Sequence, residues 1–141
     1  MGLDRAMNIS VSAIEAEQKR MEVISSNIAN INTTRSEDGG PYRRLEAVFN
    51  ETPYSFDEAL SRAEQKLSGG VDVSVVEDST PFKKVYNPSH PDSDKEGFVL
   101  LPNVELAKEM VDLVGSSKVH EANITAYNAS KKMKQDALSI Q

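Results

Sequence analysis

The sequence predicts an α+β fold with a long α-helix at each end of the chain, packed as a coiled-coil-like pair, and a small β-rich insert between them. Three observations favour this fold. Apolar residues near the N-terminus recur at alternating spacings of four and three, no proline follows Pro102, and the middle alternates apolar and polar residues between turn-rich stretches. We therefore expect an N-terminal helix within 1–32, an insert at 33–101 and a C-terminal helix within 102–141.

The N-terminal segment has the pattern of one helix with a continuous apolar seam. Positions from Leu3 to Ile31 follow the four-three spacing, and only Ser10 and Glu17 among them are not apolar. Such a helix would extend about 40 Å at 1.5 Å per residue. The pattern alone leaves open whether the seam is the core of a small bundle or an assembly surface. The residues of this N-terminal seam are Leu3, Met7, Ile14, Met21, Ile24, Ile28 and Ile31.

The C-terminal segment predicts a second long helix, with Asn103 as its N-cap. Acidic residues lie in its first third and lysines near its end, an arrangement that complements the helix macrodipole. Its apolar stripe drifts around the helix near Gly115, and the small alanines of its later part would permit a close helix neighbour. The residues of this C-terminal stripe are Leu106, Met110, Leu113, Val119, Ala122, Ala126, Ala129, Met133, Ala137 and Ile140.

The insert is different in kind from both ends. Glycine, proline and acidic residues at 36–41 predict a turn-rich loop, and helical spacing followed by Gly69 and Gly70 predicts a short helix near 56–67. Alternating apolar residues indicate short strands. The expected strands are 42–49, 71–75, 82–86 and 98–101.

Charge and composition exclude several classes of protein. Residues 1–32 carry three basic and four acidic side chains and residues 103–141 carry five of each, so most of the net charge of −6 lies in the middle. Near-neutral ends can pack many copies together, whereas a net acidic chain disfavours nucleic-acid binding. No run approaches the roughly 20 apolar residues of a membrane span. Asp4, Arg5, Glu15 and Glu17 interrupt the apolar core that a cleaved secretory signal needs, which argues against such a signal.

No motif for catalysis or for a cofactor stands out in the sequence. The chain has no cysteine, which excludes disulfides and thiolate metal sites. His90 and His120, the only histidines, lack the partners of a helical zinc site. Neither diglycine pair is followed by the lysine and serine of a phosphate loop. We therefore expect no catalytic, cofactor-binding or metal-binding residues, and no enzyme activity.

One motif at the end of the first helix has a specific resemblance. The stretch Ser25–Thr33 resembles the asparagine-rich signature that follows the N-terminal helix of bacterial flagellar rod and hook proteins. The residues that carry this motif are Ser26, Asn27, Ile28, Ala29, Asn30 and Thr33.

Further motifs, in the same order along the chain, resemble the proximal rod proteins of that family. The chain departs from the family pattern at His120, where an aromatic residue is common, and near Gly115, and the segment 51–68 matches no motif. The matching residues are Pro41, Tyr42, Arg43, Arg44, Pro88, His90, Pro91, Pro102, Asn103 and Val104.

The resemblance implies a structural subunit of the proximal rod in the flagellar basal body. Such a subunit polymerises through its terminal helices, the D0-like part of the family, into the drive shaft that transmits torque. The resemblance also implies export by the flagellar type III apparatus without signal cleavage, and a final location on the periplasmic side. The implied partners are copies of itself, other rod proteins and the export apparatus, with no small-molecule substrate, nucleic acid or membrane insertion.

Two other functions compete with this interpretation. A soluble adaptor or chaperone would close its terminal helices on each other as an antiparallel hairpin and form a well-folded monomer or dimer. A cell-wall hydrolase would need a catalytic acid in a pocket. No sequence feature favours either alternative.

Overall fold

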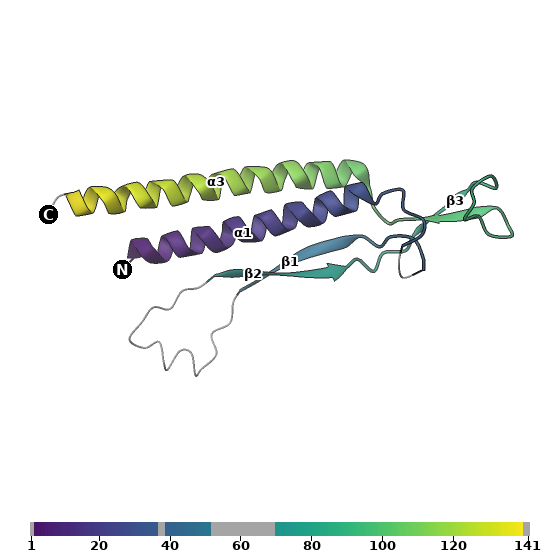
Figure 1. Cartoon of the computed structure of the whole chain (residues 1–141), viewed down its shortest axis with the longest axis horizontal. Coiled ribbons are helices and arrows are strands. Elements are labelled where there is room, and N and C mark those ends of the chain that lie inside the picture. The colour runs from purple at the N-terminus through teal and green to yellow at the C-terminus, as the bar shows by residue number, and fades with distance from the viewer. Residues whose placement is uncertain (1, 37–38, 52–69, 140–141) are drawn as a thin grey trace, which may run out of the picture.

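Two long helices, α1 (Gly2–Ala29) and α3 (Leu106–Ser139), run antiparallel and side by side along an elongated molecule, as the computed structural model in Figure 1 shows. The structure describes residues 2–36, 39–51 and 70–139. The ribbon of β1 (Leu45–Glu51) and β2 (Val71–Glu77) lies along α1, and the hairpin of β3 (Lys83–Tyr86) and β4 (Phe98–Leu101) extends beyond one end of the helices. This arrangement confirms the α+β fold with paired terminal helices.

Helix α1 lies between its two packing partners, α3 and the β1–β2 ribbon. Its buried apolar side chains are Ala16, Val23 and Ile24. The helix ends as the asparagine-rich motif predicts, because the Asn30 side-chain amide donates to the carbonyl of Ser26 at 2.9 Å. Asn27, which the sequence also suggested as part of this ending, lies within the helix and has a different role.

Helix α3 begins at Leu106, and the prediction of Asn103 as its N-cap is wrong. The Asn103 side chain points to the insert: its Oδ1 accepts the backbone N–H of Arg44 at 2.7 Å, and its Nδ2 donates to Thr80 Oγ1 at 2.9 Å. The Asn103 side chain therefore ties the insert to the chain entering α3.

Both sheets are two-stranded and antiparallel. In the first, Leu45 pairs with Glu77 and Glu51 with Val71; in the second, Lys83 pairs with Leu101 and Tyr86 with Phe98. All four strands were expected from the sequence, with boundaries shifted by up to three residues. The short helix expected near 56–67 lies outside the described residues.

The hairpin turn depends on one glycine. Gly97 has a φ of 81°, and a Cβ there would lie 3.0 Å from the ring of Tyr86, so a larger residue would be strained and crowded. The Tyr86 and Phe98 rings pack edge to face at 5.3 Å. Within the described residues, no helix is long and apolar enough to cross a membrane.

Candidate functional site

Two fully buried polar side chains and a buried arginine meet where α1 ends, β1 begins and α3 starts. Asn27 and Glu109 are both 0% exposed and Arg44 is 7% exposed. We name these three residues, with Asp78 and Asn103, the junction network. It joins four segments that are far apart in the sequence.

Asn27 pairs with the β1 backbone as a neighbouring strand would. Its Nδ2 donates to the Leu45 carbonyl at 2.8 Å, and its Oδ1 accepts the Leu45 N–H at 2.9 Å. The same Nδ2 donates to Glu109 Oε2 at 3.1 Å, and the Tyr42 hydroxyl donates to Oδ1 at 3.0 Å. One amide therefore satisfies partners on β1 and α3 and in the preceding loop.

Arg44 and Glu109 form the charged centre of the junction network. Arg44 Nε donates to Glu109 Oε1 at 2.6 Å, and its Nη1 lies 3.3 Å from Asp78 Oδ2. The pKa of Arg44 lies above its usual value: burial alone would lower it, but the hydrogen bond and negative charge of Glu109 outweigh that effect. The pKa of Asp78 lies below its usual value, first because its carboxylate accepts the Thr80 N–H and hydroxyl.

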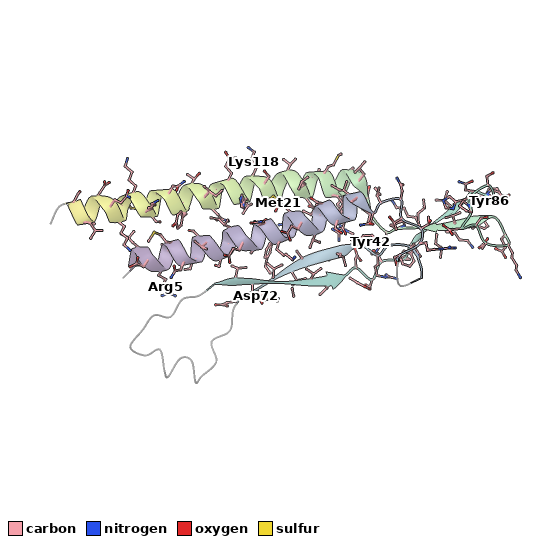
Figure 2. The ribbon with its side chains drawn as sticks, in the orientation of Figure 1. Arg5, Met21, Tyr42, Asp72, Tyr86 and Lys118 are labelled. Atoms are coloured by element: carbon pink, nitrogen blue, oxygen red, sulfur yellow. The ribbon has the colours of Figure 1, made fainter. Side chains whose placement is uncertain are left out.

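The face of α3 that packs on α1 is polar. Its buried residues are Glu109, Ser116 and Ser130. The Ser116 hydroxyl donates to Glu17 Oε2 on α1, and Lys134 Nζ donates to Asp4 Oδ1 at 2.5 Å near the far end of the pair. These contacts fix the register of the two helices at separate points along their length. Figure 2 shows the side chains along the helix pair, with Met21 of α1 and Lys118 of α3 labelled.

The N-terminal seam is partly covered within one chain. Ile24 is 4% exposed, and the other six residues of the seam are half-buried. Glu17, one of its two polar positions, meets Ser116 of α3. Most of the seam residues therefore keep some of their surface exposed in the single chain.

The C-terminal stripe has the opposite placement. Leu113 is half-buried, the other stripe residues of the described chain are exposed, and Ile140 lies outside the described residues. Met110 is 53% and Met133 is 52% exposed. Further exposed apolar residues, which the sequence stripe omitted, are Val111, Val114 and Leu138.

The motif residues do not all meet at one site. Tyr42, Arg44 and Asn103 join Asn27 at the junction, and the guanidinium of Arg43 stacks 4.4 Å from the Phe82 ring centroid. His90 lies in the loop before β4, where its Nδ1 accepts the Asp92 N–H at 3.1 Å. The other motif residues differ in how far they are buried. Pro102 and Val104 are buried, and Ala29, Pro88 and Pro91 are exposed. The half-buried residues among them are Ser26, Ile28, Asn30, Thr33 and Pro41.

The sequence did not predict the burial of Glu109 or the pairing of Glu109 and Asp78 with Arg44, although the stretch Glu109–Leu113 also resembles the rod family. Glu109 is one of several acidic residues near the start of α3, and nothing in their spacing distinguishes the buried one. The only available signal was indirect, since the buried Arg44 needs an anion nearby.

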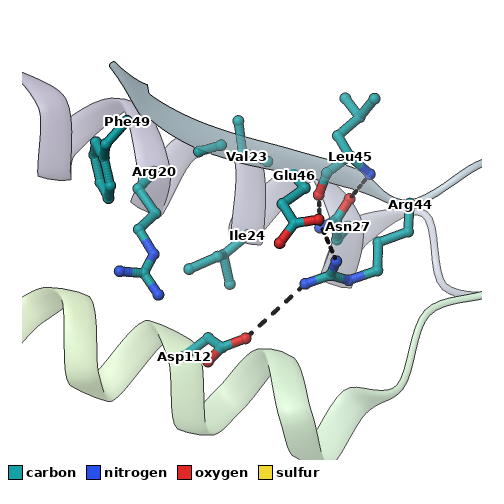
Figure 3. Close-up of a pocket in the computed structure, with 10 residues that line it drawn as sticks. Arg20, Val23, Ile24, Asn27, Arg44, Leu45, Glu46, Phe49 and Asp112 are labelled. Carbon is teal, nitrogen blue, oxygen red and sulfur yellow. Dashed lines mark hydrogen bonds and ion pairs between the residues drawn. The ribbon is translucent and has the colours of Figure 1, made fainter. Parts of the chain in front are cut away.

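A pocket of about 210 Å³ opens beside the junction network, between α1, β1 and α3 (Figure 3). Val23, Ile24, Ala47 and Phe49 give it an apolar lining, and charged side chains stand around them. Across the described ranges, no three His, Cys, Asp or Glu side chains are grouped to hold a metal ion. The lining of the pocket is therefore part apolar and part charged. Its remaining lining residues are Arg20, Asn27, Arg44, Leu45, Glu46 and Asp112.

Comparison with known proteins identifies the family. Residues 7–35 match the family described as flagella basal body rod protein. Flagellar basal-body rod protein FlgC of Borreliella burgdorferi is 42% identical, with 99% of this chain and 98% of the relative aligned. The FlgC proteins of Bacillus subtilis and Salmonella typhimurium are 44% and 36% identical over 96% and 99% of this chain and 95% and 98% of their own lengths. The chain therefore belongs to the flagellar basal-body rod protein FlgC family.

Proposed function

We propose that this chain is a structural subunit of the proximal rod that polymerises through its terminal helices and has no catalytic role. The observation that carries the proposal is the exposed apolar surface of α3. Met110, Val111 and Val114 are 53%, 72% and 62% exposed on neighbouring turns of one helix. Clustered exposed apolar residues of this kind mark interaction surfaces.

The asymmetry of the helix pair supports this mechanism. Because α3 packs on α1 largely through polar side chains, its apolar residues remain available to neighbouring subunits. Each large apolar side chain gains on the order of 1.5 to 3 kcal/mol when it is fully buried. Contacts between different surfaces of identical subunits do not have to close, and they propagate helically. We infer that assembly completes the ordering of the helical ends, and that the division at 1–32, 33–101 and 102–141 separates assembly segments from the insert.

The antiparallel helix pair is also what the adaptor alternative predicted. Family membership favours the rod, since relatives aligned over nearly their whole length are named as rod proteins. Export by the type III apparatus without signal cleavage, and placement of the rod on the periplasmic side, rest on the family resemblance. Other rod proteins and the export apparatus are the remaining partners that we propose.

The test uses a double substitution on the exposed face, Met110→Asp with Val114→Asp. Carboxylates there stay solvated in the monomer but would be buried or repelled in the polymer, at a cost of several kcal/mol. We expect the variant to fold and to be secreted, but not to restore swimming or complete basal bodies in a strain that lacks the subunit.

The matched control is Asn128→Asp, which adds a carboxylate at another exposed position of α3, outside the C-terminal stripe. Cells that carry this control variant should swim like wild-type cells. Secreted subunit is measured in parallel, so that an export defect is recognised. Normal swimming by the double variant would rule out this face as an assembly surface.

A further inference from the structure

Strand β1 has a free edge on the side away from β2. In an antiparallel pair, the backbone groups of successive residues point alternately toward the partner strand and away from it. The Asp78 N–H donates to the Arg44 carbonyl at 2.8 Å, whereas the N–H and the carbonyl of Leu45 both bond the Asn27 side chain. Even-numbered residues of β1 therefore bond to β2, and odd-numbered residues turn their backbone groups to the free edge.

The Asn27 side chain covers this edge at Leu45 alone. By the same alternation, the N–H and carbonyl groups of Ala47 and Phe49 also point to the free edge. No group of the described residues bonds to them there. A strand edge with open backbone groups is a template for pairing with another chain. Asn27 thus occupies the first position of a strand site that continues at Ala47 and Phe49.

The pocket beside the junction network, of about 210 Å³, lies along the same edge (Figure 3). Ala47 and Phe49 line it from β1, and Asp112 of α3 stands across from them. Alternate side chains of a strand added to this edge would point to the α1 side, where Val23 and Ile24 lie. Strand addition combines backbone bonds along an edge with pockets for alternate side chains, and this surface offers both.

The charges at the edge favour a basic segment. The carboxylates of Glu46 and Asp112 lie 3.9 and 4.0 Å from Arg44 nitrogens, beyond hydrogen-bond distance. Arg44 makes shorter contacts, of 2.6 and 3.3 Å, with Glu109 and Asp78. Glu46 and Asp112 therefore retain capacity to accept hydrogen bonds from a lysine or arginine of an added segment.

The described strands of a second copy would not supply such a cation. Strands β1, β2 and β4 contain no lysine or arginine. Strand β3 has two lysines, but Lys83 Nζ donates to the Val104 carbonyl at 3.5 Å, and Lys84 Nζ lies 4.4 Å from the Phe98 ring centroid. A segment of another protein therefore fits the edge better than a strand of this chain does.

We propose that the β1 edge at Ala47 and Phe49 binds an extended, basic segment of a rod protein other than this chain, as an added strand beside α3. The proposal rests on the rod function proposed above and names one surface that a neighbouring protein uses. One side chain of the segment enters the pocket, and a lysine or arginine lies beside Glu46 and Asp112.

A photo-cross-linking amino acid at the edge provides the direct test. In cells that assemble the full-length chain into rods, p-benzoylphenylalanine in place of Phe49 should link to one lysine- or arginine-containing segment of another rod protein. The same probe in place of Val85, which is 42% exposed on β3, should not reach that segment. A link from the Phe49 position only to a second copy of this chain would overturn the proposal.

The strand pairing is tested by removing one edge N–H. Ala47→Pro deletes a donor that points away from β2, a change that an edge strand tolerates, and it should abolish the link. Ala47→Ser keeps the donor and should keep the link. Persistence of the link in a folded Ala47→Pro chain would show that the segment does not pair as a strand.

Neutralising the carboxylates gives a measurement that does not depend on proline. Glu46→Gln with Asp112→Asn should lower the yield of the link, because the amides no longer attract a cation. Glu22→Gln, at a side chain of α1 that is 56% exposed, should leave the yield unchanged. An unchanged yield in the double variant would contradict a basic segment.

The proposed strand and the proposed function fail in different ways. No link in cells that still complete rods would overturn the strand contact and leave the rod function intact. Absence of the wild-type chain from isolated rods would instead overturn the proposed function.

Discussion

The two long helices differ in the side chains that they bury. Helix α1 buries the apolar Ala16, Val23 and Ile24 together with the polar Glu17 and Asn27, whereas the buried residues of α3, which are Glu109, Ser116 and Ser130, are all polar. Helix α1 is therefore part of the chain's own apolar core, packed on both sides. Helix α3 is held to it by specific polar contacts and keeps much of its apolar surface outside. Under the proposed function, α1 would serve mainly the folding of the single chain, and the outer surface of α3 would bind other subunits.

Polar contacts suit a helix that must adopt one register without a continuous apolar interface. Asn27 meets Glu109 at one end of the pair, Glu17 meets Ser116 further along, and Lys134 meets Asp4 at the far end. Asn27, Glu109, Glu17 and Ser116 are buried, whereas Lys134 and Asp4 are 45% and 31% exposed at their side chains. We expect the junction end to contribute much more stability than the far end.

The largest effect should follow from Glu109→Ala. The substitution leaves the Arg44 guanidinium buried without its closest anion, and breaking a buried ion pair in this way typically costs about 3 to 5 kcal/mol. We expect a loss of this size in the free energy of unfolding, measured by urea denaturation of the purified chain. The matched control is Glu105→Ala, an exposed position in the turn that leads into α3, which should change stability by less than about 0.5 kcal/mol. Equal effects from the two would show that the junction network does not hold α3.

The next largest effect comes from a pair of substitutions, one in each helix, whose losses of stability are compared directly. Ile24→Ala should lower the free energy of unfolding by about 2 to 5 kcal/mol, because it leaves a cavity in the core. Met110→Ala should change it by less than about 0.5 kcal/mol, because Met110 is half exposed in the monomer. Both are measured on the monomer by the same denaturation. A large loss for Met110→Ala would mean that the outer face of α3 already has a partner within the chain.

The sequence predicts the elements of the fold better than it predicts their contacts. The four-three spacing and the absence of proline after Pro102 were sufficient for both helices, and the alternation of Val71, Val73 and Val75 was sufficient for β2. Periodicity reports where a helix is apolar, but not which neighbour covers that surface. It therefore could not show that the N-terminal seam is partly covered within the chain while most of the C-terminal stripe is exposed.

The candidate site was less accessible to sequence analysis for a related reason. Asn27 was placed in a motif that ends the helix, whereas its side chain pairs with Leu45, 18 positions along the chain. Glu109 lies a further 64 residues beyond Leu45. Contacts between polar residues at such separations leave no local pattern, because each depends on how the chain folds back.

The smallest effect should come from the far end of the helix pair. Lys134 and Asp4 are 45% and 31% exposed at their side chains, and salt bridges near the surface contribute about 0 to 1 kcal/mol. Lys134→Ala should therefore lower the free energy of unfolding by less than about 1 kcal/mol, and the difference from wild type should shrink as salt screens the pair. Amide exchange should show faster exchange in the first turns of α1 and the last turns of α3, with the junction unchanged. Lys132→Ala removes an exposed lysine from the same region and should leave exchange in the monomer unaltered. If Lys134→Ala destabilised the chain as much as Glu109→Ala, the helix pair would be anchored equally at both ends, and α3 would not depend mainly on the junction.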